Sequence, residues 1–148
     1  MHQEQAKELH LLFFSFMWLF HQKFWRKLRQ DDEFTCKITK NQAKVIHTLY
    51  QLDSLTFTEL SRLLDIEKAG LTTIISQLED LGLVERCVDP EDRRKYRLSL
   101  SNQAKKDMDQ VVARSTQTLL ELFEDVEDAE LEEFRRHLRQ VVEFMKKL

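Results

Sequence analysis

The stretch Leu55–Leu100 constrains the fold of this chain more than any other, and its last third is the most specific part. Two short segments, Val84–Val88 and Tyr96–Leu100, flank a polar turn that holds the only proline, Pro90. The second segment alternates apolar and polar residues strictly, as a half-buried strand does. Proline lacks an N–H donor and has a fixed φ, so it belongs at a tip or an edge. The pattern therefore predicts a β-hairpin with a polar tip.

Two short helical patterns lie immediately upstream of this hairpin. Thr56–Glu59 has the S/T-x-x-E form of a capping box and predicts a helix that runs through Leu64. A second helix is predicted where apolar residues recur with helical spacing before Gly82, which stands where a glycine would end it. Its apolar residues are Leu71, Ile74, Ile75, Leu78 and Leu81. Helix, tight turn, helix and two-stranded ribbon in this order form a winged helix-turn-helix, whose second helix enters the DNA major groove.

The hairpin and the helix end before it form one longer run. From Leu78 to Ser101 it reads L-E-D-L-G-L-V-E-R-x-x-D-P-E-D-R-R-K-x-x-L-S-L-S. This run resembles the signature of MarR-type transcriptional regulators, and its most specific portion is Asp89–Arg94. The resemblance implies a winged helix-turn-helix set between terminal helices that interlock two subunits. It also implies action mainly as a repressor, by covering promoter DNA.

Length and composition agree with this fold class. At 148 residues the chain suits one domain that is large enough for a real core. Charged residues make up 33% and hydrophobic residues 42%, with only two glycines and one proline, which favours a mainly α protein with a small β-hairpin wing. We expect a single domain over 1–148, with the winged helix-turn-helix over 39–100 and dimerisation helices over 1–30 and 101–148.

Long helical patterns flank the winged region. Over about residues 4–29, an apolar stripe is accompanied by Phe14, Trp18 and Trp25, which lie off the stripe. A helix that is apolar on more than one side must be covered on more than one side. A partner subunit supplies that cover, whereas the alternative is the central core helix of a monomer. Further helices are expected from a capping box at Thr39–Gln42 to about Leu52, from Ser101 to about 125, and over about 129–147.

The charges are distributed unevenly along the chain. The net charge of −3 does not by itself suggest a nucleic-acid partner. Residues 93–97, however, hold four positive side chains and no negative one, whereas 121–133 hold eight acids and no base. The basic charge is therefore concentrated where the hairpin would touch phosphate.

The N-terminal segment and the cysteines indicate a cytoplasmic protein that does not enter a membrane. Leu11–Phe20 is apolar except for Ser15, but it is too short to span a bilayer and lacks signal-peptide features, so it is expected to be a buried helix. Cys36 and Cys87 cannot form a disulfide framework and show no metal-type spacing.

The second helix of the helix-turn-helix is the candidate recognition helix. Its outward face carries the predicted DNA contacts Lys68, Thr72, Thr73, Ser76 and Gln77. Glutamine can pair with adenine, and threonine can hydrogen-bond bases or contact thymine methyl groups. Many members of the resembled family carry a basic residue where Thr73 falls, and Gly70 is also unusual. These departures affect base preference and affinity more than entry into the groove. The alternative is an ordinary helix with a solvated polar face.

The hairpin tip supplies the other predicted DNA contacts, Arg93, Arg94 and Lys95. An arginine at a hairpin tip can enter a narrow minor groove, where the negative potential is enhanced. A second arginine can pair with Asp92 and hold the tip in shape, since a guanidinium fork suits a carboxylate. The sequence leaves open which arginine has which role.

The predicted function is sequence-specific binding of double-stranded DNA by a homodimer at a pseudo-palindromic operator. As an enzyme the chain offers no phosphate-cradling loop, metal motif or close His–Cys pair, and no cofactor is expected. The alternative function is a winged helix that serves only protein interaction.

Two signals could control the DNA affinity of such a regulator. MarR-like proteins often bind small aromatic or lipophilic compounds, for which Phe16, Phe20 and Phe24 are candidate pocket residues, although aromatic stripes are often simple core. Some members sense oxidants through a cysteine. Cys36 lies near Lys37, which could depress its pKa, and is the redox candidate; the alternative is an unreactive thiol, and Cys87 is expected to be a packing residue.

Overall fold

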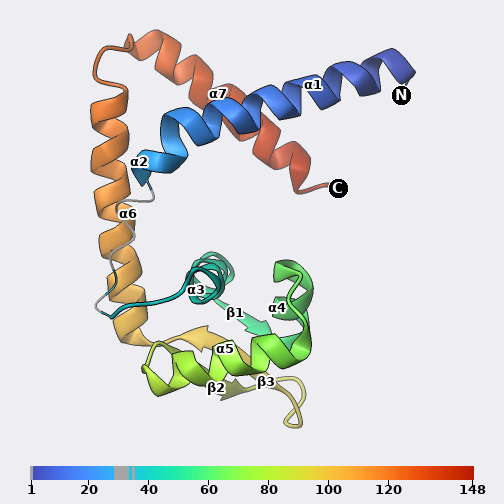
Figure 1. Cartoon of the computed structure of the whole chain (residues 1–148), viewed down its shortest axis with the longest axis vertical. Helices are drawn as coiled ribbons and strands as arrows, with labels where there is room; N and C mark the ends of the chain where they lie inside the picture. Colours follow the sequence, from blue (N-terminus) through green and yellow to red (C-terminus); the bar gives the residue numbers. More distant parts are fainter. Residues whose placement is uncertain (1, 29–33, 35) are drawn as a thin grey trace.

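The computed structural model describes residues 2–28, 34 and 36–148. In chain order the elements are α1 (Gln3–Phe20), η1 (His21–Trp25, a π-helical turn), α2 (Arg26–Leu28), α3 (Lys40–Leu52), β1 (Ser54–Thr56), α4 (Phe57–Leu64), α5 (Lys68–Asp80), β2 (Val84–Val88), β3 (Tyr96–Leu100), α6 (Asn102–Leu122) and α7 (Asp128–Met145). Figure 1 shows α3, α4, α5 and the strands gathered at one end of the molecule, with α6 running from them to the end that holds α1 and α7.

The sheet contains the expected hairpin and one strand more. β2 and β3 pair antiparallel from Val84 opposite Leu100 to Val88 opposite Tyr96, which confirms the predicted hairpin. The third strand, β1, pairs with the other side of β3 and places Leu55 opposite Leu98, so the strand order is β1-β3-β2. The sequence did not predict β1, because three residues are too short to show a strand periodicity.

Local hydrogen bonds fix the ends of the helices as the sequence predicts. The capping boxes at Thr39 and Thr56 are both closed, with the glutamine or glutamate three residues on reaching back to the first backbone N–H. The Ser101 Oγ accepts the backbone N–H of Ala104 at 3.1 Å and caps α6. Gly82 has a φ of +68°, a left-handed conformation that glycine adopts without strain, and it ends α5.

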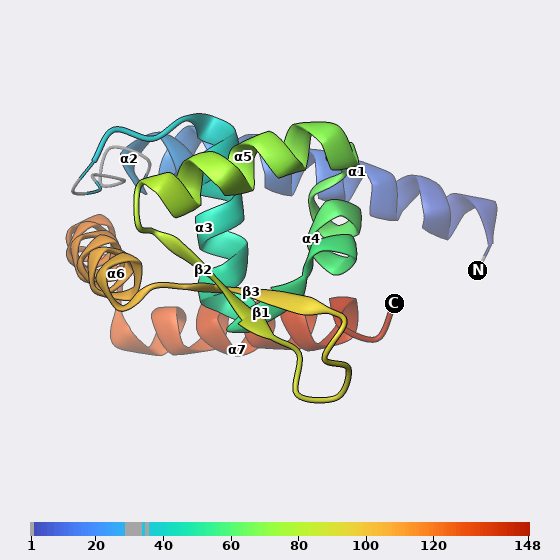
Figure 2. The ribbon, with the colours of Figure 1, turned by 90° about the horizontal axis from the view of Figure 1, so that it is seen from below.

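The buried core lies inside the winged unit. It combines α3, α4 and α5 with the inner face of the sheet and the first turns of α6 (Figure 2). α5 contributes the fully buried side chains of Leu71, Ile75 and Leu78, and it lies across α3 in this view. The residues of α3 that complete this core are Val45, Ile46 and Leu49. The core therefore fixes one face of α5 and leaves the opposite face to solvent.

The terminal helices differ from the rest because their apolar side chains are exposed in the single chain. Leu11–Phe20 is helical as expected, but the single chain does not bury it, since no residue of α1 among those described is buried and Phe14 is 67% exposed. Its burial by a partner subunit stays a prediction. The N-terminal helix also turns into the π-helical segment after Phe20, and the predicted end near residue 29 lies outside the described residues. None of the helices in the described ranges combines the length and apolar character that crossing a bilayer requires.

Candidate nucleic-acid interface

The predicted recognition residues lie together on the exposed face of α5. Lys68, Thr72, Thr73, Ser76 and Gln77 are all exposed, because the three buried residues of this helix hold the other face against the core. The hydroxyl of Thr72 donates to the Lys68 carbonyl at 2.8 Å and that of Thr73 to the Ala69 carbonyl at 3.3 Å. With their protons donated within the helix, these hydroxyls can accept from a base but not donate to it, and their methyl groups can contact thymine methyl groups.

The Gln77 side chain is hydrogen-bonded to Gln42 of α3, which the sequence indicated only as part of a capping box. Gln42 of α3 is only 6% exposed, and its side-chain oxygen accepts the N–H of Thr39 at 2.8 Å. Its amide nitrogen donates to the Gln77 Oε1 at 3.0 Å. The Gln77 amide nitrogen is thereby directed away from Gln42 and can donate to an acceptor on a base edge. The capping box at Thr39 was visible in the sequence, but its link to Gln77, 35 residues away, was not.

A charged pair joins the recognition helix to the wing. The Arg86 guanidinium of β2 donates to both carboxylate oxygens of Glu79 in α5, at 2.7 and 2.8 Å. This hydrogen bonding raises the pKa of Arg86 further above its ordinary value, so the arginine stays charged. A bidentate pair restricts the relative orientation of its two elements more than a single contact does. The pair therefore sets the hairpin relative to α5.

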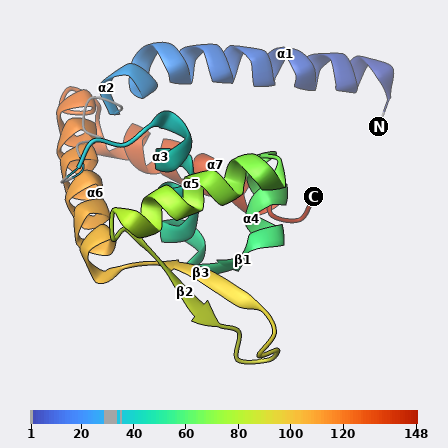
Figure 3. The ribbon, with the colours of Figure 1, turned by 60° about the horizontal axis from the view of Figure 1, so that its bottom comes forward.

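The wing tip carries three exposed cations. Figure 3 shows the hairpin projecting past α5, on the side opposite α1. The Asp92 carboxylate accepts the backbone N–H of Arg94 at 3.0 Å, and its oxygens lie 3.9 Å from the Arg94 Nε and 3.6 Å from the Lys95 Nζ. Arg93 forms no ion pair with any residue that the structure describes. The arginine beside Asp92 is thus Arg94, which leaves Arg93 with an unpaired guanidinium.

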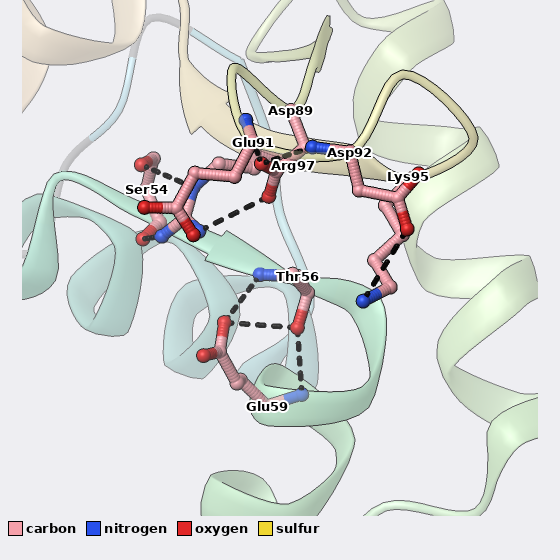
Figure 4. Close-up of polar contacts among 8 residues, drawn as sticks. All are labelled: Ser54, Thr56, Glu59, Asp89, Glu91, Asp92, Lys95 and Arg97. Carbon is pink, nitrogen blue, oxygen red and sulfur yellow. Dashed lines mark hydrogen bonds and ion pairs between the residues drawn. The ribbon is translucent and has the colours of Figure 1, made fainter.

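The sequence groups Arg97 with the three tip cations in the basic segment where the hairpin would touch phosphate, but the structure separates it from them. Its side chain turns toward the sheet, where Nε donates to the Ser54 Oγ at 3.0 Å and Nη2 to the Ser54 carbonyl at 2.8 Å (Figure 4). Its Nη1 lies 3.4 Å from the Asp89 carboxylate. The sequence indicated a polar residue on an alternating strand, but its partner Ser54 lies on β1, which was not predicted. The cations at the tip are therefore Arg93, Arg94 and Lys95.

Asp89 is the buried carboxylate at the base of the tip. It is 7% exposed, and its Oδ1 accepts the backbone N–H groups of Glu91 at 2.8 Å and Asp92 at 3.3 Å (Figure 4). The Glu91 N–H lowers the pKa of Asp89 most, with the Asp92 N–H and Arg97 acting in the same direction against the effect of burial. Asp89 therefore stays ionised at neutral pH and orders the turn.

A cavity in the described part of the chain lies between η1, α2, α3 and α6. Its volume is about 760 Å³. The candidate pocket residues Phe16, Phe20 and Phe24 are not among the residues that line it; they stack in a row that continues through Phe123 to Phe134 of α7. The lining is instead Trp25, Leu28, Lys40, Ala43, Lys44, His47, Thr48, Tyr50, Gln51, Leu64, Met108, Val111, Val112, Ser115, Thr116 and Leu119.

The two cysteines occupy different environments. Cys36 is half-buried and packs against the core, and the neighbouring Lys37 side chain is exposed. The expectation that Cys87 is a packing residue is wrong, because it points to solvent on the outer face of β2, where its Sγ lies 3.9 Å from the Ser99 Oγ. Within the described residues, no group of three or more histidine, cysteine, aspartate or glutamate side chains could hold a metal ion.

A helix-turn-helix with an exposed polar recognition face and a cationic β-wing defines a winged-helix DNA-binding protein. Comparison with known proteins gives the family. The MarR family model matches residues 38–96, and an HTH-type transcriptional regulator of Bacillus subtilis, YsmB, is 30% identical over 110 residues, or 74% of this chain and 75% of YsmB. The chain belongs to the MarR family of transcriptional regulators, which are not enzymes.

Solved structures confirm the predicted fold. A MarR family protein from Bacillus stearothermophilus has a TM-score of 0.72 and 23% identity, covering 99% of each chain. MepR of S. aureus, solved with ethidium bromide bound, has a TM-score of 0.64 and 22% identity, covering 89% of this chain and 94% of its own. The similarity to the Bacillus stearothermophilus protein extends over the terminal helices as well as the winged unit.

Proposed function

We propose that this DNA-binding regulator acts as a homodimeric repressor that places one α5 in each of two major grooves of a pseudo-palindromic operator. The observation that carries this proposal is the pairing of an exposed polar face on α5 with a tip of three exposed cations on the adjoining hairpin. Hydrogen-bonding side chains read base edges, and cations contact the negatively charged backbone or a narrow minor groove.

The terminal helices supply the reason to expect a dimer. α1 and α7 expose apolar side chains that a single chain leaves in water, and contiguous patches of this kind mark interaction surfaces. The large apolar residues of α7 that are exposed include Phe134, Leu138, Val141 and Phe144. A second copy with the same faces would cover them by exchanging like surfaces about a two-fold axis. Two-fold symmetry would in turn present two recognition helices to one duplex.

Fragments of the source genome that the protein retains are expected to contain paired half-sites about 10 bp apart, each protected from cleavage. Sedimentation at micromolar concentration should show a dimer. Affinity should fall steeply as salt rises, because phosphate contacts release counterions. A fully folded monomer, or protection of one unpaired half-site, would contradict the dimer. Absence of duplex binding at low salt would favour the protein-interaction module instead.

Between the two expected signals, the structure supports a ligand in the cavity of about 760 Å³ more than oxidation of the half-buried Cys36. The residues that line the cavity include the aromatic Trp25 and Tyr50 and the basic Lys40 and Lys44. Among the residues that line it within the described ranges, none is acidic. We infer an aromatic or lipophilic effector that carries negative charge. The aromatic ligand bound to the similar regulator MepR supports the aromatic part of this inference.

The charge of the effector can be tested with two compounds of the same shape. 2-Naphthoate is expected to weaken operator binding more than the neutral 2-naphthamide, because the lysines attract a carboxylate. Lys44→Gln should reduce the apparent affinity for naphthoate by about two- to fivefold, the range for a partly exposed ion pair, and leave that for naphthamide unchanged. Lys106→Gln, an exposed lysine outside the cavity lining, is the matched control. Equal responses to both compounds would refute the anionic effector.

A further inference from the structure

We propose that Arg97 is a positioning residue that braces the wing from the central strand of the sheet, and that it makes no DNA contact itself. This inference rests on the proposed function, since it concerns how the wing is presented to a duplex. It distinguishes Arg97 from its neighbours Arg93, Arg94 and Lys95, which lie on the same basic segment but point to solvent.

The position of Arg97 in the sheet gives it this role. Arg97 pairs with Thr56 of β1 on one side and with Cys87 of β2 on the other, and this is the last rung at which three strands are joined. At the next rung, Val88 opposite Tyr96, β1 has ended and the ribbon has two strands. A two-stranded ribbon is marginally stable by itself in water. The part of the wing that would reach DNA therefore begins where the support of the sheet stops.

The Arg97 side chain spans this point. Backward, two guanidinium nitrogens hold both the hydroxyl and the carbonyl of Ser54 at 3.0 and 2.8 Å. Forward, the third nitrogen lies 3.4 Å from the Asp89 carboxylate at the start of the turn (Figure 4). All three nitrogens are used, two toward Ser54 and one toward Asp89, which the planar fork of arginine permits and the single ammonium of lysine does not.

Asp89 passes this restraint to the tip. The carboxylate that meets Arg97 also accepts the N–H groups of Glu91 and Asp92. Asp92 in turn accepts the N–H of Arg94 and lies near the Lys95 ammonium. A continuous series of polar contacts thus runs from β1, through Arg97 and Asp89, to the residues that carry the exposed cations. Without it, the tip must be ordered at the moment of binding, and the entropy cost at that step weakens affinity.

Substitutions that separate the charge of Arg97 from its hydrogen-bonding geometry test its role as a positioning residue. Arg97→Lys keeps the charge and removes the fork, so operator affinity should fall by roughly tenfold, as when hydrogen bonds to charged groups are removed. The slope of log affinity against log salt should not change, because every phosphate contact remains. Arg135→Lys, the same substitution at an exposed arginine of α7 outside the wing and α5, is the matched control and should leave the affinity unchanged. If Arg97→Lys binds like the unmodified protein, or if Arg97→Met lowers the slope by about 0.9, Arg97 is a phosphate contact and the proposal is wrong.

For Asp89→Asn, the proposal and simple charge repulsion predict opposite changes in the affinity for DNA. Removal of a negative charge beside the wing should tighten DNA binding if only electrostatics matters. The proposal instead expects weaker binding, because the amide offers one oxygen where the carboxylate offers two. Tighter binding by Asp89→Asn would overturn it. Ser54→Ala removes only the hydroxyl that accepts from Arg97, so it should decrease the affinity for DNA less than Arg97→Lys does. It provides a milder test of the same contact if the other variants fold poorly.

Amide hydrogen exchange in the DNA-free protein separates this proposal from the proposed function. The Glu91 and Asp92 amides should exchange at least roughly tenfold faster in Arg97→Lys than in the unmodified protein, with the exchange of core amides in α5 unchanged. Unchanged exchange at both amides would refute the brace even if the protein binds DNA. Faster exchange in a protein that binds no duplex would leave the brace standing and remove the proposed function.

Discussion

Replacement of Arg93 and Arg94 together by alanine is expected to weaken operator binding by about 2–4 kcal/mol, since each wing of a dimer would give up charge-assisted interactions of about 1–2 kcal/mol. The slope of log affinity against log salt should fall by about 0.9 for each phosphate that the wing no longer neutralises. The fold should be retained, because the Arg94 side chain is 96% exposed and the Asp92 hydrogen bond that orders the turn goes to the Arg94 backbone. Titration of one operator and one scrambled duplex at several salt concentrations measures both quantities.

Thr73→Ala provides the contrast to the arginine variant. Its side chain lies on the exposed face of α5 that is proposed to read bases, and it carries no charge. The variant should alter preference among operators and leave the salt slope nearly unchanged. If the double arginine variant binds with unchanged affinity and slope, the wing does not touch DNA, and the proposed operator complex loses its main electrostatic support.

Leu78→Ala is expected to lower the free energy of unfolding by about 2–5 kcal/mol, the range for deletion of buried leucine methyl groups. Leu78 is fully buried on the inner face of α5, so the cavity left by truncation lies under the recognition helix itself. Urea unfolding at a fixed subunit concentration measures the decrease, since the stability of a dimer depends on concentration.

Leu63→Ala in α4 is the matched control, because the same substitution is made at a side chain that is 57% exposed. Leu63→Ala should lower the free energy of unfolding by well under half as much as Leu78→Ala, because the side chain that it truncates buries less apolar surface. Equal decreases for Leu63→Ala and Leu78→Ala would show that the core does not hold α5 in the manner described.

The sequence predicted those features that depend on neighbouring residues. Capping boxes close within four residues, and the second hairpin strand alternates within five, so both were visible without tertiary information. The exposed face of α5 followed from the spacing of Leu71, Ile75 and Leu78 in the same way. The family resemblance rested on the run from Leu78 to Ser101, and the family model, which matches residues 38–96, covers much of that run.

The features that were missed depend on contacts between distant parts of the chain. Arg97 was assigned to the phosphate-facing charge because its Ser54 partner lies 43 residues away on a strand too short to recognise. The pocket candidates Phe16, Phe20 and Phe24 line no part of the cavity, because they stack toward Phe123, whereas Trp25 lines it. Cys87 was expected to pack because it lies on the first strand of the wing, but it is exposed on the outer face of an edge strand.

Helix α3 contacts both the cavity and the exposed face of α5, and this would link binding of a compound to recognition of a base. One side of α3 lines the cavity through Lys40, Lys44 and His47, while Gln42 on another side holds the Gln77 side chain. In the proposed regulator, a compound that shifts α3 would therefore also shift the group that reads one base. Thermodynamic linkage is reciprocal, so the base at that position would change the affinity for the compound by the same factor. Promoters with different operators could then respond to different concentrations of one compound, with a single protein setting several thresholds.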